Sequence, residues 1–231
     1  VGDRPAGVIL VIAGITMVVG VLGAIAQDDI KRILSFHIVS QIGYMVMGLG
    51  FFTVVGLAAT VFYVIHHIVV KTTLFLVGGL VEHSSGSGAL ARVGGIARRF
   101  PLLGWLFLIP ALSLAGIPPF SGFVAKLALV EAGVGSGAWV LVVVSLAVSV
   151  LTLFSMTQIW GGAFWGGPQP DAAPTGPGSR CGGTAAMLIP TAALAVLSLA
   201  VALWAGPLFD LSERAAQDLL NPASYVSAVL R

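Results

Sequence analysis

Long apolar runs that carry no charged side chain are the feature that most constrains how this chain folds. Residues 6–26 contain no Asp, Glu, Lys or Arg, and comparable apolar runs recur along the sequence. A membrane-spanning helix needs about 20 mostly apolar residues. Charged residues make up 9% of the 231 residues, whereas a soluble domain carries about 25%, so too few remain to cover a water-facing surface. The sequence therefore predicts an all-α integral membrane protein that crosses the bilayer several times.

The apolar runs predict about six crossings, one of them broken near its middle. Unbroken helices are expected over about residues 6–26, 33–53, 55–81, 138–160 and 184–209, and the broken one over 101–133. A Pro/Gly-rich loop, 167–183, precedes the last helix, and a surface tail, 210–231, follows it. The first residue is Val1 rather than Met, so we expect either a fragment of a longer protein or a non-standard start.

The break in the fourth crossing is predicted from its prolines and glycines. Pro118 and Pro119 remove two backbone donors and fix φ, and Gly116 and Gly122 loosen the chain on either side. Neither half is long enough to span the bilayer alone. A broken crossing is tolerated only where the freed backbone groups are buried in protein or line a hydrated cavity. This segment is therefore a candidate functional site.

Basic residues in the loops predict the orientation of the chain. With six crossings, one side of the membrane collects Lys31, Arg32, Arg92, Arg98, Arg99 and Arg180. The opposite side collects Arg4, Arg214 and Arg231. The positive-inside rule places the larger set in the cytoplasm. We therefore expect a multi-pass protein of the cell membrane with both chain ends outside.

Two lysines, Lys71 and Lys126, lie at membrane depth in the predicted helices. A charged lysine at a helix centre costs about 2.5–3.5 kcal/mol on insertion scales, and such residues often mark ion or proton paths. The alternative is that each side chain reaches the interface, but Lys71 lies about ten residues, roughly 15 Å, from the cytoplasmic end of its helix. Lys126 follows the break at mid-depth. Because burial disfavours the charged form of a lysine, both are candidate proton carriers.

Polar residues at a spacing of four accompany these lysines. His67 precedes Lys71 by four residues and shares its helix face, so it is either a proton relay or a helix–helix hydrogen-bonding group. For His66 we favour the structural hydrogen bond. His37 and Gln41 repeat the spacing; Gln41 cannot titrate but can order water, and His37 is either a proton entry point or an interfacial residue.

Metal, haem, hydrolytic and nucleic-acid chemistry fit the sequence poorly. His66 and His67 diverge on a helix and have no acidic neighbour, and the single cysteine, Cys181, excludes a cysteine-only metal site. No nucleophile–base arrangement is present, and the net charge of +2 comes without a basic stripe. We therefore expect no metal, no cofactor, no nucleic-acid partner and no enzymatic activity.

Three segments of the chain resemble a known family of membrane proteins. They are Asp29–Ser35 leading to Ser40–Tyr44, then His67–Leu76, and then Gly116–Lys126. Each is similar to the antiporter-like subunits of respiratory NADH–quinone oxidoreductase and of Mrp-type Na⁺/H⁺ antiporters. Residues 151–166 most resemble the D-type subunit of the Mrp group, and Gln41 agrees with it, since some oxidoreductase subunits have His there.

The resemblance implies the second half of a fourteen-helix fold that contains two inverted five-helix repeats. Residues 1–166 would be the second repeat and residues 184–209 the last helix. The implied function is that of a proton-conducting subunit of a multisubunit Na⁺/proton antiporter, with the other Mrp subunits as partners and protons passing along a hydrated axis at mid-membrane. In such a protein Lys126 would be the central switch, Lys71 and His67 relay groups, and His37 and Gln41 water-ordering neighbours.

Three other functions remain open from the sequence. The first is a proton-pumping subunit of NADH–quinone oxidoreductase or of a membrane hydrogenase. The second is a non-transporting helix bundle that only packs against partner subunits. The third is a small-solute carrier, because broken helices also bind substrates, but the chain has no second broken helix.

Overall fold

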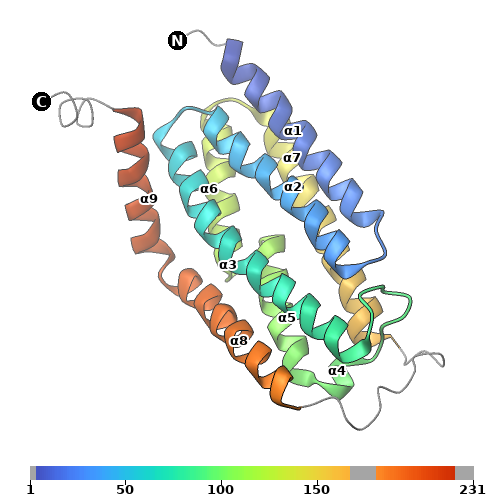
Figure 1. The fold of residues 1–231 in the computed structure, drawn as a ribbon. Helices are drawn as coiled ribbons and strands as arrows, with labels where there is room; N and C mark the ends of the chain where they lie inside the picture. The colour runs from blue at the N-terminus through green and yellow to red at the C-terminus, as the bar shows by residue number, and fades with distance from the viewer. Residues whose placement is uncertain (1–3, 167–180, 222–231) are drawn as a thin grey trace, which may run out of the picture.

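The computed structural model describes residues 4–166 and 181–221, and its named elements are all helices (Figure 1). Residues 167–180 of the predicted loop and 222–231 of the predicted tail lie outside the described residues. The long helices are α1 Arg4–Ile25, α2 Ile30–Gly50, α3 Val54–Ser85, α7 Trp139–Ile159 and α8 Cys181–Leu203. The shorter ones are α4 Ile96–Arg99, α5 Pro101–Ala115, α6 Ser121–Gly135 and α9 Ala205–Leu220, and α7 continues as a π-helix over Trp160–Trp165.

Five of the described helices are long and apolar enough to cross a membrane, namely α1, α2, α3, α7 with its π-helical extension, and α8. Helices α5 and α6 are each too short to cross alone. They follow one another along the length of α3 and together occupy the place of one more crossing (Figure 1). The predicted all-α, multi-pass class with one broken crossing agrees with this arrangement.

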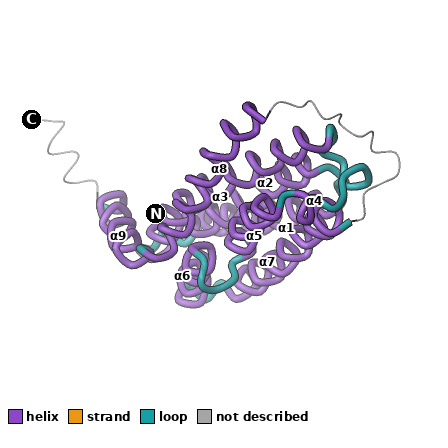
Figure 2. The backbone as a smooth tube through the Cα atoms, turned by 90° about the horizontal axis from the view of Figure 1, so that it is seen from below, coloured by secondary structure: helices purple, strands orange, loops and turns teal. Residues whose placement is uncertain are grey.

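Helix α3 is the longest helix and lies in the middle of the bundle. It contacts α2, α5, α6, α8 and α9, and α8 and α7 lie on opposite sides of it (Figures 1 and 2). The buried apolar side chains form two main clusters along the bundle. Leu114, before the break, belongs to one cluster, and Ala125, after it, belongs to the other. The break between α5 and α6 therefore lies where the two apolar cores meet.

Side chains in the loops set where α2 and α3 begin. The Asp29 carboxylate accepts a hydrogen bond from the backbone N–H of Arg32 at 3.1 Å, and the Thr53 hydroxyl accepts one from Gly56 at 3.1 Å. Each side chain thereby satisfies a donor that the first helical turn leaves free. With this cap, α2 begins at Ile30 rather than near residue 33, and it ends at Gly50 rather than 53.

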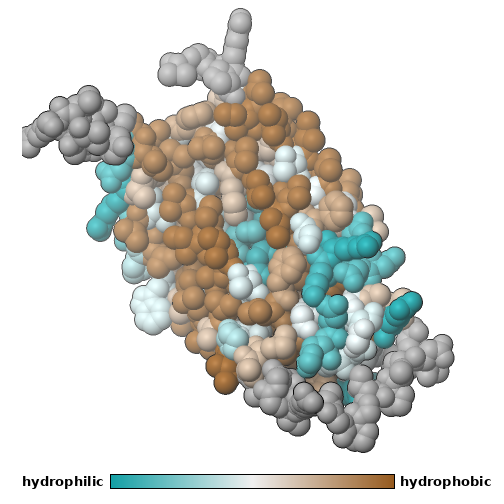
Figure 3. Space-filling view, viewed as in Figure 1, coloured by the Kyte–Doolittle hydropathy of each residue, from teal (hydrophilic) through white to brown (hydrophobic). Residues whose placement is uncertain are grey.

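The loop before α2 is tied to the loop after α3. Ile30 N donates to Gly88 O at 3.0 Å, and Leu90 N donates to Asp28 O at 2.8 Å. Lys31 and Glu82 form an ion pair nearby. These contacts hold the ends of α2 and α3 together at the end of the bundle where hydrophilic side chains gather (Figure 3). Most of the remaining surface in that view is apolar, as a lipid-facing surface requires.

The last membrane helix ends six residues earlier than the sequence pattern suggests. Helix α8 stops at Leu203, and residues 205–220 form the separate helix α9. Pro207 explains the stop, because proline has no N–H to donate to the carbonyl of Leu203 and its ring clashes with that carbonyl in a continuous helix. Part of α9 is buried: Ala216 packs with Leu57 and Ala58 of α3. The residues expected to lie at the surface as a tail thus include a helix packed on the bundle.

Gly122, in the first turn of α6, allows the two halves of the broken crossing to pack closely. A Cβ at this position would overlap the carbonyl oxygen of Ser113 in α5. The Gly122 N–H also faces the Ser113 hydroxyl at 3.5 Å. Only a residue without a side chain fits between these backbones.

We predict that Gly122→Val destabilises the protein by about 1–3 kcal/mol, the usual cost of overpacking. Thermal unfolding of the purified protein in detergent measures this as a lower Tm. The matched control is Gly135→Ala in the same helix, where a Cβ meets nothing within 4 Å. Equal Tm values for Gly122→Val and the wild type would show that α5 and α6 are not packed as described.

Candidate functional site

Lys126 is buried at the break, where its amine meets the free end of α5. Nζ donates hydrogen bonds to the carbonyl oxygens of Leu114 at 3.0 Å and Ala115 at 3.1 Å. The last carbonyls of a helix have no intrahelical partner and carry the negative end of the helix dipole. Lys126 therefore satisfies backbone groups that the break exposes, and those groups offer its charge a partner inside the membrane.

Gly116 makes room for this contact. It has a φ of 86°, in the left-handed region, where it ends α5. A Cβ at Gly116 would lie 2.8 Å from Cδ of Lys126. Both the turn and the passage of the lysine side chain require glycine here.

Tyr44 of α2 lies against Lys126. The amine is 5.0 Å from the centroid of the tyrosine ring, within the range of a cation–π interaction. The hydroxyl of Tyr44 donates to the Ser145 carbonyl and lies 2.8 Å from the Ser149 hydroxyl, so α7 fixes the ring. The ring also stacks on Tyr63 of α3, with centroids 5.7 Å apart and planes 8° apart. Contacts with α7 and with α3 therefore fix the Tyr44 ring in its position beside Lys126.

Lys71 is also buried, but it has a different partner. Its Nζ donates to the carbonyl oxygen of Leu34 in α2 at 2.8 Å. The ion pair among the described residues is Lys31 with Glu82, so neither Lys71 nor Lys126 is paired with a carboxylate in this part of the chain. Glu131, the acidic residue of α6, is exposed.

The histidines and Gln41 join neighbouring helices. His37 Nε2 lies 2.9 Å from the Ser155 hydroxyl of α7, and Gln41 accepts a hydrogen bond from the Tyr63 hydroxyl. His66 Nδ1 lies 2.8 Å from the Ser121 hydroxyl at the start of α6. The helix–helix hydrogen bond expected of His66 is thus present.

Four buried nitrogens in α2 and α3 have no hydrogen-bond partner within the described protein: His37 Nδ1, Gln41 Nε2, His66 Nε2 and His67 Nε2. Buried polar groups in proteins almost always have a partner, and ordered water often supplies it. We refer to His37, Gln41, Tyr44, Tyr63, His66, His67, Lys71 and Lys126 together as the buried polar row. Its unpartnered nitrogens are suited to hold water.

Sequence reasoning assigned five members of this row to a proton path and His66 to a helix–helix hydrogen bond, but it gave no role to Tyr63, Ser121 or Ser155. The structure brings Lys126 against the helix break, His67 and Lys71 onto α3, and His37 and Gln41 onto α2. Tyr63 was not predicted, although it precedes His67 by four residues and therefore shares its face. Ser121 and Ser155 carry no distinguishing signal, because single serines in membrane helices are common as packing residues.

A metal site is not formed by the described residues, since no three His, Cys, Asp or Glu side chains come together there. What remains is a row of titratable and polar groups around two buried amines. Ionisable groups inside membrane helices often mark ion or proton paths.

Comparison with known proteins connects this row to a family. The family described as NADH:quinone oxidoreductase/Mrp antiporter, transmembrane, matches residues 5–152, which include both lysines and the whole helix break. The chain belongs to this family. The resemblance noted in the sequence is confirmed.

Two curated relatives within the family are named as the D-type subunit of a Na⁺/H⁺ antiporter. The one from Alkalihalophilus pseudofirmus (strain ATCC BAA-2126 / JCM 17055 / OF4) is 43% identical over 223 residues, and the one from Bacillus subtilis (strain 168) is 34% identical over 223 residues. The alignments cover 96% and 95% of this chain but 44% of each relative. The chain is thus a homologue of part of the D-type antiporter subunit and spans less than half of its length.

Solved structures of the family share the fold. A chain of the Mrp complex from Dietzia sp. DQ12-45-1b is 37% identical, with a TM-score of 0.90 over 99% of this chain and 50% of that chain. A chain of respiratory complex I from Thermus thermophilus is 28% identical, with a TM-score of 0.69 over 88% of this chain and 45% of that chain. The predicted fold class, half of an antiporter-like subunit, is confirmed.

Proposed function

We propose that this chain is the proton-conducting membrane part of the D-type subunit in a multisubunit Na⁺/proton antiporter of the Mrp type. The observation that carries the proposal is Lys126, a buried amine held at a broken helix by carbonyls and an aromatic face instead of a carboxylate. The two carbonyls reduce the cost of burying this charge, and ionisable residues placed inside membrane helices often mark ion or proton paths. The names of the two curated relatives support the choice of cation, and the similarity to a chain of the Mrp complex supports the choice of assembly.

The mechanism follows from how each amine is held. When Lys126 is charged, the carbonyls of Leu114 and Ala115 and the ring of Tyr44 stabilise the ammonium. When Lys126 loses its proton, it loses the positive charge that the two carbonyls and the ring attract. The charge at the α5–α6 junction therefore changes with every proton transfer. Lys126 is therefore the central switch of the proposed path.

The remaining residues extend the path on either side of α3. Lys71 and His67, on one face of α3, act as relay groups that pass the proton toward α2. His37 and Gln41 hold the connecting water through His37 Nδ1 and Gln41 Nε2, which have no partner within the described protein.

A proton-pumping subunit of NADH–quinone oxidoreductase is the second candidate. The family description covers both assemblies, and the similarity to complex I from Thermus thermophilus favours this reading specifically. The higher identity and TM-score against the Mrp chain favour the antiporter. In both assemblies the chain acts as a transporter part rather than as an enzyme by itself.

The basic residues support an orientation with both ends outside. Lys31, Arg32 and Arg92 lie at the end of the bundle where α2 begins and α3 ends, which we assign to the cytoplasm. Arg4 and Arg214 belong to helices whose free ends lie toward the opposite end (Figure 1). Arg180 and Arg231 lie outside the described residues.

We predict that Lys126→Ala abolishes Na⁺-dependent proton exchange while the protein still assembles with its partners. Lys126→Arg should fail too, because arginine does not release its proton in proteins. Release of protons from acidified everted membrane vesicles on addition of Na⁺ measures exchange, and co-purification of partner subunits measures assembly. Lys31→Ala, at an exposed lysine, is the control that should keep exchange. Near-normal exchange by either Lys126 variant would remove it from the mechanism and favour the non-transporting scaffold.

The Tyr44 ring gives a second, graded prediction. Tyr44→Phe keeps the ring beside Lys126, whereas Tyr44→Leu removes an attraction of about 0.5–2 kcal/mol and should lower exchange by about twofold to thirtyfold. The control is Phe62→Leu, a buried aromatic that packs on Phe209 instead. If Leu and Phe at position 44 gave the same rate, the ring would have no role at Lys126.

Orientation is tested by cysteine labelling in intact cells. In a variant with Cys181→Ser, a cysteine introduced at His83 should react with an impermeant maleimide only after the membrane is opened. One introduced at Ser136, between α6 and α7, should react in intact cells. Both positions are exposed. The reverse pattern would place the basic end outside and overturn the proposed topology.

A further inference from the structure

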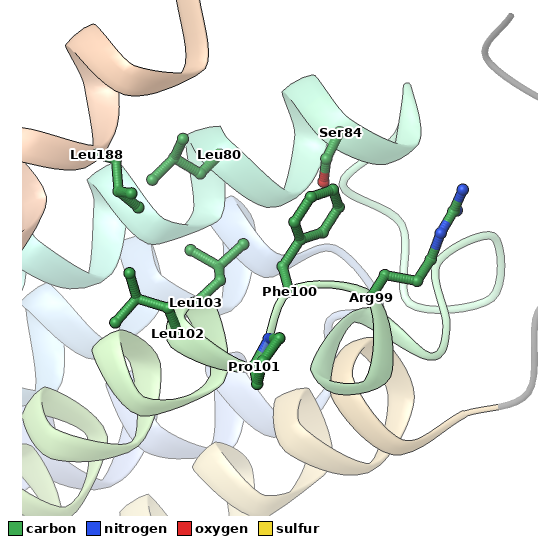
Figure 4. A pocket seen from close by; sticks show the side chains of 8 residues that line it. All are labelled: Leu80, Ser84, Arg99, Phe100, Pro101, Leu102, Leu103 and Leu188. Atoms are coloured by element: carbon green, nitrogen blue, oxygen red, sulfur yellow. The ribbon is translucent and has the colours of Figure 1, made fainter. Parts of the chain in front are cut away.

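A cavity of about 260 Å³ lies between α3, α5 and α8, apart from the buried polar row (Figure 4). Half of the residues that line it are leucines: Leu80 of α3, Leu102 and Leu103 of α5, and Leu188 of α8. Leu80 and Leu103 are buried, whereas Leu102 is 52% exposed at the mouth. The cavity is therefore an apolar cleft between membrane helices that is open to the surroundings of the protein.

The polar groups of the cavity are confined to one end. Arg99, in the last turn of α4, points away from the leucines, and Ser84 and Phe100 lie between them (Figure 4). Arg98 is exposed beside Arg99. None of the residues that line the cavity is acidic. The cleft itself thus suits a hydrocarbon chain, and the Arg99 guanidinium lies beyond its polar end, where it can meet an anion at the surface.

The cleft lies at the level of helix ends, where we expect the boundary of the bilayer. Ser84 lies one residue before the end of α3, and Pro101 is the first residue of α5. These helix ends belong to the basic end of the bundle that also carries Lys31, Arg32 and Arg92. A phospholipid whose acyl chain enters between the helices has its phosphate at this level.

We propose that this cleft binds an anionic phospholipid, with one acyl chain along Leu80, Leu103 and Leu188 and the headgroup phosphate at Arg99. Arginine donates several hydrogen bonds in a planar array that suits phosphate oxygens. Basic pockets between membrane helices on the cytoplasmic side select anionic headgroups. A zwitterionic lipid would bring an ammonium group to a place where no acidic residue lines the cavity. The proposal is independent of the role of Lys126.

Photolabelling tests the selectivity of the cleft. Phosphatidylglycerol and phosphatidylcholine with the same diazirine-bearing acyl chain are incorporated separately into membranes that contain the full-length protein in its native assembly. After irradiation, mass spectrometry locates the labelled peptides. We expect phosphatidylglycerol to label the peptides of Leu102, Leu103 and Leu188 at least severalfold more than phosphatidylcholine. Equal labelling by the two lipids, or no labelling of these peptides, would refute an anionic-lipid site.

Two variants and one control connect the lipid selectivity to the residues of the cleft. Arg99→Gln should reduce phosphatidylglycerol labelling to the level of phosphatidylcholine, whereas Arg92→Gln, at an exposed arginine that does not line the cavity, should leave it unchanged. Leu102→Trp should obstruct the mouth and reduce labelling by both lipids. Unchanged selectivity in Arg99→Gln would overturn the assignment of the headgroup.

A photoreactive residue decides between a lipid and a protein occupant. Benzoylphenylalanine in place of Leu102 should capture a phospholipid, seen as a mass increase of the modified peptide. Capture of a peptide from a partner protein, or from residues 167–180 of this chain, would show that protein fills the cleft and would refute the proposal.

Discussion

The rest of the structure depends on how the backbone groups at the broken crossing are satisfied inside the membrane. Lipid offers no hydrogen bonds, so each carbonyl freed at the end of α5 costs several kcal/mol unless the protein supplies a donor. Lys126 supplies it to Leu114 and Ala115. The same lysine is itself costly to bury, and the free carbonyls reduce that cost. The lysine lowers the cost of the free carbonyls, and the carbonyls lower the cost of the buried charge. This explains why the break and the lysine occur together.

Neighbouring helices are arranged to keep this contact in place. Gly116 leaves space for the lysine stem, and Gly122 lets α6 approach α5 until backbone meets backbone. His66 reaches from α3 to Ser121 at the start of α6, and Tyr44 reaches from α2 to the amine. Thus α2, α3 and α6 converge on the junction, and a change of charge at Lys126 acts directly on the groups that position it.

The fold and the site differ in how far the sequence predicts them. The crossings and the break follow from local composition, because apolar runs and paired prolines act on the residues that carry them. The start of α2 and the end of α8 were misplaced by a few residues, since a capping bond at Asp29 and the missing donor of Pro207 outweigh the apolar pattern. Tyr63, Ser121 and Ser155 could not be assigned, because their roles depend on which helices become neighbours.

The two buried lysines are not equivalent, and the difference lies in the backbone that receives them. Leu34 sits inside the continuous helix α2, so its carbonyl already accepts a helical hydrogen bond and offers Lys71 only its second lone pair. Lys126 meets the end of a helix, where two carbonyls lack helical partners, and it also has the face of Tyr44. The site therefore offers a charged amine more stabilisation at Lys126 than at Lys71. In the proton path proposed above, this difference would make the broken helix the favoured position of the proton, and α3 would be its route toward α2.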